Sequence, residues 1–135
     1  MAATAMEKER MLEAETLNVQ LEGIERRLQS LARSRVQARE LLTTLDALPT
    51  IVEGDEILVP IATGLFVRAK AGVAGALFVN VGDGVTVEKS VSDVRAMVST
   101  QIEQIVAQEN EGQQRFESAL ARMSELQQAF EPKDA

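Results

Sequence analysis

Apolar residues recur at alternating spacings of three and four through the first third of the chain, which is the pattern of a coiled-coil seam. The segment is rich in Glu, Arg, Leu, Ala and Gln, which favour helix, and it contains no proline before Pro49. We therefore predict a helix over residues about 5–48. Arg35 interrupts its seam, whose apolar members are Ala14, Leu17, Leu21, Ile24, Leu28, Leu31, Ala38, Leu42 and Leu45.

Residues about 91–131 carry the same pattern. Ser90 with Asp93 three residues later resembles a capping box and marks the expected helix start. Each helix would be roughly 60 Å long at 1.5 Å per residue. Two helices of matched length, joined by a folded insert, predict an antiparallel coiled-coil hairpin. The second seam reads Val98, Ile102, Ile105, Glu109, Gly112, Phe116, Ala119, Met123, Leu126 and Phe130.

The misfits in the two seams suggest a register. If facing residues have numbers that sum to 147, Arg35 faces Gly112 and Ala38 faces Glu109, so each large polar residue faces a small one. Arg35 and Glu109 then lie in adjacent layers and can form an ion pair. A paired charge in a seam can fix its register. The alternative is that these residues are ordinary local defects of a coiled coil.

The insert, about 56–89, changes to β-type runs. Thr63-Gly64 and Asp83-Gly84 end two predicted three-residue hairpin loops, each with glycine last, where a left-handed residue is needed. A shift of 20 residues superposes the two hairpins, for example Val59 on Val79. The predicted fold class is therefore α+β: a long antiparallel coiled-coil hairpin bearing two β-hairpins. Its parts would be a helix in 1–50, the hairpins in 51–90 and a helix in 91–135.

The hairpins carry more apolar surface than this chain is expected to cover, because both helices are committed to each other. One face of the first strand holds Ile57, Val59 and Ile61, and one face of the third holds Leu77, Val79 and Val81. Two isolated hairpins are marginal in water, and open strand edges invite pairing. We expect the hairpins to join hairpins of other chains in a larger sheet or barrel.

Composition excludes several functional classes. The chain has no His, Cys, Tyr or Trp, so the usual general base, thiolate nucleophile and commonest metal ligands are absent, and we expect neither an enzyme, a metal site nor a cofactor. Its net charge is −7 and no segment is strongly basic, which argues against nucleic-acid binding. No apolar run approaches the roughly 20 residues that span a bilayer. A soluble cytoplasmic protein is the expectation.

Apolar residues outside the seam gather near the termini. With Leu17 at heptad position d, Leu12 and Val19 fall at f, which is normally solvated and charged. Methionine suits contacts with many partners because its side chain is flexible and polarizable. These residues predict an adaptable hydrophobic tip, although a frayed end or a local helix contact would also explain them. The set is Met6, Met11, Leu12, Val19 and Leu120.

The order helix, two hairpins, helix, together with two hairpin segments, resembles the prefoldin alpha subunits of archaea. The segments are Leu58-Val59-Pro60-Ile61 with Gly64-Leu65-Phe66-Val67, and Phe78-Val79-Asn80-Val81-Gly82-Asp83-Gly84-Val85-Thr86-Val87. The resemblance implies an ATP-independent chaperone in which two alpha and four beta subunits form a hexamer around a β-barrel. Its coiled-coil tips would bind non-native polypeptides and deliver them to a group II chaperonin.

The resemblance also assigns roles to residues. Assembly would fall on Val59, Ile61, Phe66, Val67, Leu77, Val79 and Val81, and client binding on Met6, Met11, Leu12, Leu120, Met123 and Phe130. Met123 and Phe130 are seam positions as well, and coiled-coil packing explains them better. The main rival is a structural or adaptor coiled-coil oligomer without client binding. An enzyme and a polymerase factor with an acidic coiled-coil tip are weaker rivals, because no carboxylate pair and no short acidic turn stands out.

Overall fold

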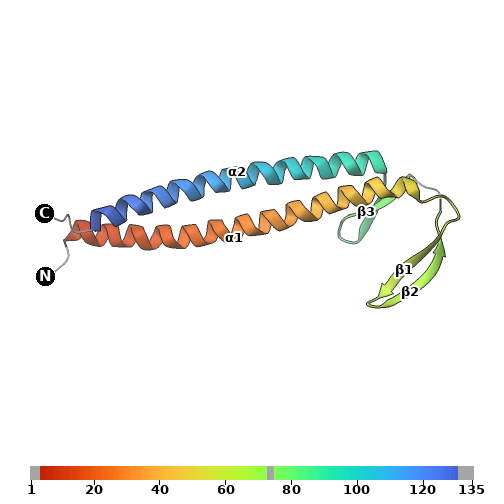
Figure 1. Cartoon of the computed structure of the whole chain (residues 1–135), viewed down its shortest axis with the longest axis horizontal. Coiled ribbons are helices and arrows are strands. Elements are labelled where there is room, and N and C mark those ends of the chain that lie inside the picture. Colours follow the sequence, from red (N-terminus) through yellow and green to blue (C-terminus); the bar gives the residue numbers. More distant parts are fainter. Residues whose placement is uncertain (1–3, 73–74, 131–135) are drawn as a thin grey trace. The chain divides into compact units, whose positions relative to one another are not determined.

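The computed structural model describes residues 4–72 and 75–130, the last of them by its backbone only. In sequence order, one long helix precedes the four strands and a second long helix follows them (red to blue in Figure 1). The elements are α1 (Ala5–Ala47), a 3-10 turn η1 (Leu48–Thr50), β1 (Glu56–Ala62), β2 (Leu65–Lys70), β3 (Ala76–Gly82), β4 (Val85–Ser90) and α2 (Val91–Phe130). The predicted α+β order of helix, two antiparallel hairpins and helix is confirmed.

Hydroxyl side chains begin both helices. At α1 the backbone N–H of Glu7 donates to Thr4 Oγ1 at 3.1 Å, and the N–H of Thr4 donates to Glu7 Oε2 at 3.2 Å, which completes a capping box. At α2 the N–H of Asp93 donates to Ser90 Oγ at 3.1 Å, as the sequence predicted. Pro49 lies in η1, directly after α1. No helix among the described residues is long and apolar enough to cross a membrane.

The chain divides into two compact units. The helical unit combines Met1–Arg35 with Gln104–Ala135, and the hairpin unit is Val36–Glu103. Within the helical unit, α1 and α2 run side by side and antiparallel (Figure 1). All the predicted apolar seam positions described in this unit are buried or half-buried, as a heptad seam requires. They are Ala14, Leu17, Leu21, Ile24, Leu28, Leu31, Ile105, Phe116, Ala119, Met123 and Leu126.

The register of the helical unit differs from the prediction by one heptad. Gly112 lies against Leu28 and not against Arg35, because a Cβ added to Gly112 would be 2.9 Å from Leu28 Cδ2. Consistent with this shift, Arg27 donates a hydrogen bond to Gln108 at 3.1 Å, and Arg122 donates to Glu13 at 2.7 Å. A heptad pattern is unchanged when one helix slides by seven residues, so only the non-apolar seam residues can distinguish the possible registers. The prediction placed Arg35 opposite a small residue, and this size criterion selects the wrong register.

The hairpin unit has its own core, formed where the proximal turns of α1 and α2 meet. Ala38 and Leu45 of α1 and Val94 and Val98 of α2 are buried together. Partly buried side chains pack around them, namely Leu42, Leu48, Leu77, Val79, Val91 and Ile102. An ion pair between Arg95 and Asp46 joins the same helix segments at their exposed side. Two strand residues, Leu77 and Val79 of β3, thus belong to the helix core.

The two hairpins have the same register. Val59 pairs with Val67 in the first and Val79 with Val87 in the second, and the irregularity falls at Pro60/Ala62 and at Asn80/Gly82. Every pair of one hairpin maps onto a pair of the other after a shift of 20 residues, which confirms the predicted repeat. At the turns, β1 and β3 extend one residue further than predicted, through Ala62 and Gly82, so two residues connect each pair of strands.

The turns differ in backbone conformation although the registers agree. Gly64 and Gly84 have positive φ values of 78° and 74°, as predicted for the last loop residue. In the second hairpin Asp83 also has a positive φ, of 51°, whereas the equivalent Thr63 does not. Two successive positive φ values are the mark of a type I′ turn, whose twist matches that of the flanking strands. Asp83 is therefore the one non-glycine residue with a positive φ among the described residues of the hairpin segment.

Candidate functional site: assembly and binding surfaces

The β1–β2 hairpin exposes apolar side chains on both faces. Val59 and Val67 form a cross-strand pair on one face, and Pro60 and Phe66 form a pair on the other. Phe66 is 56% exposed, although a ring of this size normally lies in a core. Ile61 and Val67 are exposed as well, and only Ile57 among the predicted assembly residues of this hairpin is half-buried. The face of Pro60 and Phe66 is apolar only near the turn, because Arg68 stands opposite Leu58 and Lys70 opposite Glu56 further along it.

The β3–β4 hairpin covers one of its faces within this chain. Leu77 and Val79 pack on the helix core of the hairpin unit, so the expectation that the helices leave this face uncovered is wrong. The expectation assumed that a helix pair buries only its own seam, but the core formed by Ala38 and Leu45 also accepts two strand residues. Of the three residues predicted for assembly here, Val81 alone is exposed.

The opposite face of β3–β4 holds the exposed ring that sequence reasoning did not select. Phe78 is 73% exposed and stands opposite Glu88, beside the pair of Asn80 with Thr86. The regular apolar alternation of Leu77, Val79 and Val81 points to the other face, so a search for alternation misses Phe78. A useful signal was available: a phenylalanine among polar neighbours is costly in water and needs a partner.

The predicted tip residues of the helical unit are exposed. Met6, Met11 and Leu120 are all at least half exposed, and Leu12 and Val19 are 63% and 66% exposed. At 100° per residue, Leu12 and Val19 share the face of α1 that lies roughly opposite its seam, while Met11 projects about 100° away. The structure therefore does not gather the five side chains into one patch. Leu12 and Val19 form the one stripe among them on α1.

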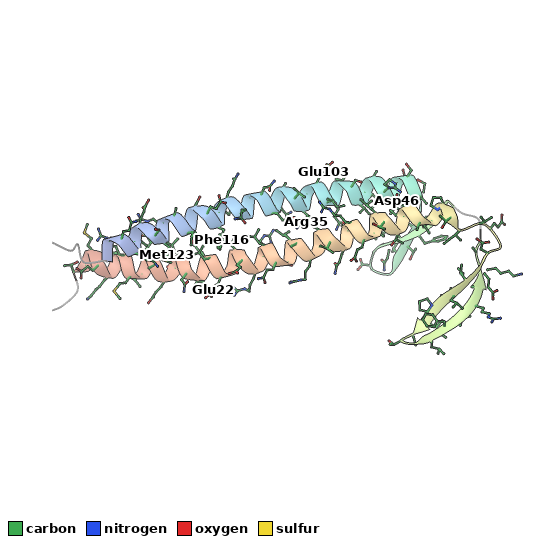
Figure 2. All side chains as sticks on the ribbon, viewed as in Figure 1. Glu22, Arg35, Asp46, Glu103, Phe116 and Met123 are labelled. Carbon is green, nitrogen blue, oxygen red and sulfur yellow. The ribbon has the colours of Figure 1, made fainter. Side chains whose placement is uncertain are left out.

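The two predicted tip residues that also belong to the seam behave differently. Met123 is half-buried, and Figure 2 shows it together with Phe116 between the two helices. Coiled-coil packing is thus the observed environment of Met123. The side chain of Phe130 lies outside the described residues.

Among the described residues of the helical unit, ion pairs join the two helices at two levels. Arg35 Nε lies 2.9 Å from Glu109 Oε1, so the predicted ion pair is present. The two side chains are 31% and 20% exposed, and Figure 2 shows Arg35 between the helices. This Nε–H is not aligned as a hydrogen-bond donor to any described residue, so the contact is an ion pair at short distance. Its role in setting the register stays a prediction.

The second ion pair, between Arg122 and Glu13, is bidentate. Arg122 Nε and Nη2 donate to the two carboxylate oxygens of Glu13 at 2.7 and 3.1 Å, and Nη1 donates to Glu125 at 2.9 Å. The hydrogen bond from Arg122 lowers the pKa of the Glu13 carboxyl below its usual range, and it raises the pKa of Arg122 in return. Both groups are exposed, so the pair orients the helix ends more than it stabilises them.

The described residues offer no arrangement suited to holding a metal ion, since no three Asp or Glu side chains among them come close enough. The features that stand out are apolar surfaces on the hairpins, apolar side chains on the outer helix faces, and charged contacts across the seam. These features fit contact with other polypeptides.

A model of the family described as "Prefoldin subunit" matches residues 17–133. Among curated proteins, a prefoldin subunit alpha from Methanothrix thermoacetophila is 40% identical over 57 residues, 42% of this chain and 37% of that protein. A prefoldin subunit alpha from Methanococcus aeolicus is 29% identical over 77 residues, 57% of this chain and 54% of that protein. The matched stretches thus span roughly a third to a half of these relatives.

The fold has a counterpart among solved structures. A cryo-EM structure of filamentous PFD from Methanocaldococcus jannaschii superposes with a TM-score of 0.72. The superposition covers 84% of this chain and 94% of that one, at 22% sequence identity. At this identity the likeness concerns the fold.

Proposed function

Because this chain belongs to the prefoldin family, we propose that it is the alpha-type subunit of an ATP-independent chaperone. Two such subunits would combine with four beta-type subunits, bind non-native polypeptides, and pass them to a group II chaperonin. The names of the two curated relatives support the alpha type, and the presence of two hairpins agrees with it.

The observation that carries the proposal is the exposure of two phenylalanine rings on the hairpins, Phe66 and Phe78. Burying apolar surface contributes about 25 cal/mol per Å², so two rings left in water are a strong drive toward association. Strand edges of the hairpins offer unpaired backbone groups next to those rings. Subunits that add strands to these edges would complete a barrel and cover the rings in one step.

Client binding would fall to exposed apolar residues of the helical unit. Each contact is small, so one subunit would bind weakly, and several subunits around a shared cavity would bind by effective concentration. The flexible side chains of Met6 and Met11 suit clients of varied sequence. Leu12, Val19 and Leu120 complete the proposed set. Met123 packs in the seam and is a weaker candidate.

One experiment separates this proposal from a purely structural coiled-coil oligomer. A chain lacking residues 1–12 is mixed with a beta-type prefoldin subunit, and the mass of the complex and its suppression of aggregation of a denatured test protein are measured. We expect an intact hexamer with greatly reduced suppression, because the deletion removes Met6, Met11 and Leu12 but no hairpin residue. The control is the double variant Glu15→Gln/Glu22→Gln, which changes charge on exposed positions of α1 and leaves the apolar residues in place.

Full suppression by the truncated hexamer would favour the structural oligomer. A chain that stays monomeric with every beta-type subunit tested would contradict the proposed assembly.

A further inference from the structure

A groove runs along one side of the helical unit, between α1 and α2. A wide part of about 890 Å³ extends from Leu17 to Arg27 on α1, and a narrower part of about 230 Å³ continues to Leu31. The two parts share Ile24, Arg27, Glu111 and Arg115, so they form one continuous groove. Over the 14 residue steps from Leu17 to Leu31 its length is about 21 Å.

A helix-interior glycine deepens the groove without serving the packing of the helices. Glycine costs roughly 1 kcal/mol in a helix relative to alanine. At Gly112 the close approach of Leu28 explains why a glycine is present, because a Cβ there would be 2.9 Å from that side chain. At Gly23 a Cβ would meet no side chain nearer than the guanidinium of Arg26 at 4.0 Å. Gly23 thus leaves open space beside the groove, and no neighbour in the structure requires it.

The groove also differs in charge from the rest of the chain. The wide part is lined by three arginines and one glutamate, a formal net charge of +2 in a chain of net charge −7. Arg115 pairs with Glu111, and Arg122 pairs with Glu13 and Glu125. Arg27 donates a hydrogen bond to Gln108 and forms no ion pair with a described residue. A carboxylate of a partner can therefore pair with Arg27 without displacing a carboxylate of this chain, unlike at Arg115 and Arg122.

From this combination we infer that the groove binds an amphipathic helix with an apolar stripe and acidic flanks, supplied by a polypeptide partner. Leu17 and Ile24 form the apolar floor, and the missing side chain at Gly23 lets the partner backbone approach closely. A helix of about 14 residues matches the length of the groove. Packed there, it would form a local three-helix bundle with heptad contacts. The inference deepens the proposed function, because it names a class of client segment.

The test measures peptide binding by fluorescence anisotropy on the full chain in the complex that it forms. The probe is a dye-labelled 18-residue peptide with Leu at heptad spacing and Glu at the flanking positions, and the comparison peptide carries Lys in place of Glu. We expect the Glu peptide to bind at least tenfold more tightly at low salt, and this preference to shrink as salt screens the charges.

Two variants probe the groove itself. Gly23→Leu fills it, and we expect about tenfold weaker binding of the Glu peptide with no loss of thermal stability, because leucine favours helix. The second variant, Arg27→Gln, should weaken binding about threefold and reduce the salt dependence. The matched controls are Ser30→Leu and Arg33→Gln, which make the same kinds of change at exposed positions outside the groove, and both should bind normally. If Gly23→Leu lowers the melting temperature, Gly23→Ala replaces it, with an expected loss of about threefold.

Equal binding of the two peptides, or unchanged binding by Gly23→Leu and Gly23→Ala, would overturn the inference. A change in the mass of the complex on Gly23→Leu, with peptide affinity unchanged, would also overturn it and would assign the groove to contacts between subunits. The hexamer mass and aggregation suppression of the same variants report on the proposed function separately. If the peptide does not bind in the groove, the chaperone proposal is unaffected. If the subunits do not assemble, the mass measurement shows it without the peptide.

Discussion

The ion pair between Arg35 and Glu109 shows how a charged residue can occupy a seam position of a coiled coil. Each side chain is about two-thirds to four-fifths covered, and the oppositely charged partner lies 2.9 Å away. Removing one partner leaves the other charge poorly solvated, whereas removing both leaves an apolar seam. We therefore predict that the pair contributes more to the choice of register than to the stability of the correct one.

Replacing Arg35 alone by Leu should lower the free energy of unfolding by about 1–2 kcal/mol, because Glu109 loses its partner. The double variant Arg35→Leu/Glu109→Leu should recover most of that loss, and it should populate more than one register. Thermal melts followed by helical circular dichroism measure the first effect. Disulfide trapping between cysteines introduced at positions 28 and 112 measures the second. A double variant as unstable as the single one would contradict this account.

The pH dependence of stability has a defined source at Glu13. Its pKa is lowered in the folded chain by the hydrogen bond from Arg122, so this contact stabilises the fold above the unfolded pKa of about 4.3 and is lost as pH falls through the lower folded value. Replacing Glu13 by Gln should therefore lower the melting temperature slightly near pH 7 and leave it unchanged toward about pH 3. The matched control is Glu15→Gln, an exposed neighbour in no ion pair with a described residue, and it should show no such pH-dependent difference.

Among the elements, the hairpins show how register and turn chemistry are separable. Both hairpins pair their strands identically, yet only the second uses a non-glycine residue with positive φ, Asp83. Aspartate tolerates this conformation better than most residues because its short polar side chain can bond locally. The same strand pairing is therefore compatible with two turn conformations.

Asp83→Ala should destabilise the β3–β4 hairpin by about 1 kcal/mol, because alanine tolerates the left-handed conformation less well than aspartate. The same change at the equivalent position, Thr63→Ala, should leave the β1–β2 hairpin almost unaffected, since Thr63 has no positive φ. Amide hydrogen exchange of the strand residues measures both. Equal loss of protection in the two hairpins would show that the turn conformation does not matter. Asp83→Gly should restore the exchange protection.

Much of the element structure could be predicted from sequence, for identifiable reasons. The heptads, the cap at Ser90 and the glycines at 64 and 84 are local signals, and each fixed an element or an end correctly. Two features could not be predicted, namely the register of the two helices and the segment that covers the face of β3 holding Leu77. Both depend on contacts between segments that are distant in the sequence. A repeat of seven residues permits several alignments, and a strand face does not reveal whether helix or neighbouring subunit covers it.

On the scale of the whole molecule, the chain leaves two of its phenylalanine rings in water. Phe66 and Phe78 are exposed on separate hairpins, while the buried core consists of small and medium aliphatic residues such as Ala38, Leu45 and Val98. The folding of one chain therefore relies on its helix seams, and the rings are available for contacts with other chains.

This division of roles predicts which substitutions affect assembly alone. Phe78→Ser should leave the helical circular dichroism and the melting of the isolated chain nearly unchanged, but it should weaken the complex with beta-type subunits, as judged by its mass at decreasing concentration. Phe66→Ser should do the same at the other hairpin. Leu77→Ser is the contrasting variant: because Leu77 packs on the helix core, it should lower the melting temperature of the chain itself. A complex that is insensitive to both phenylalanine variants would assign assembly to other residues.

The identical registers of the two hairpins have a consequence for how many neighbours one chain can hold. In the proposed assembly, a partner surface that fits one hairpin would find a second of the same strand geometry on the same polypeptide, so each chain would hold two neighbours. The two contacts would be unequal, because Leu77 and Val79 pack one hairpin on the helix core, whereas no described residue of the other hairpin belongs to that core. The packed hairpin would fix the orientation of its neighbour, and the other would adopt the orientation that its neighbour requires. A ring of subunits could then close without an exact fit at every contact.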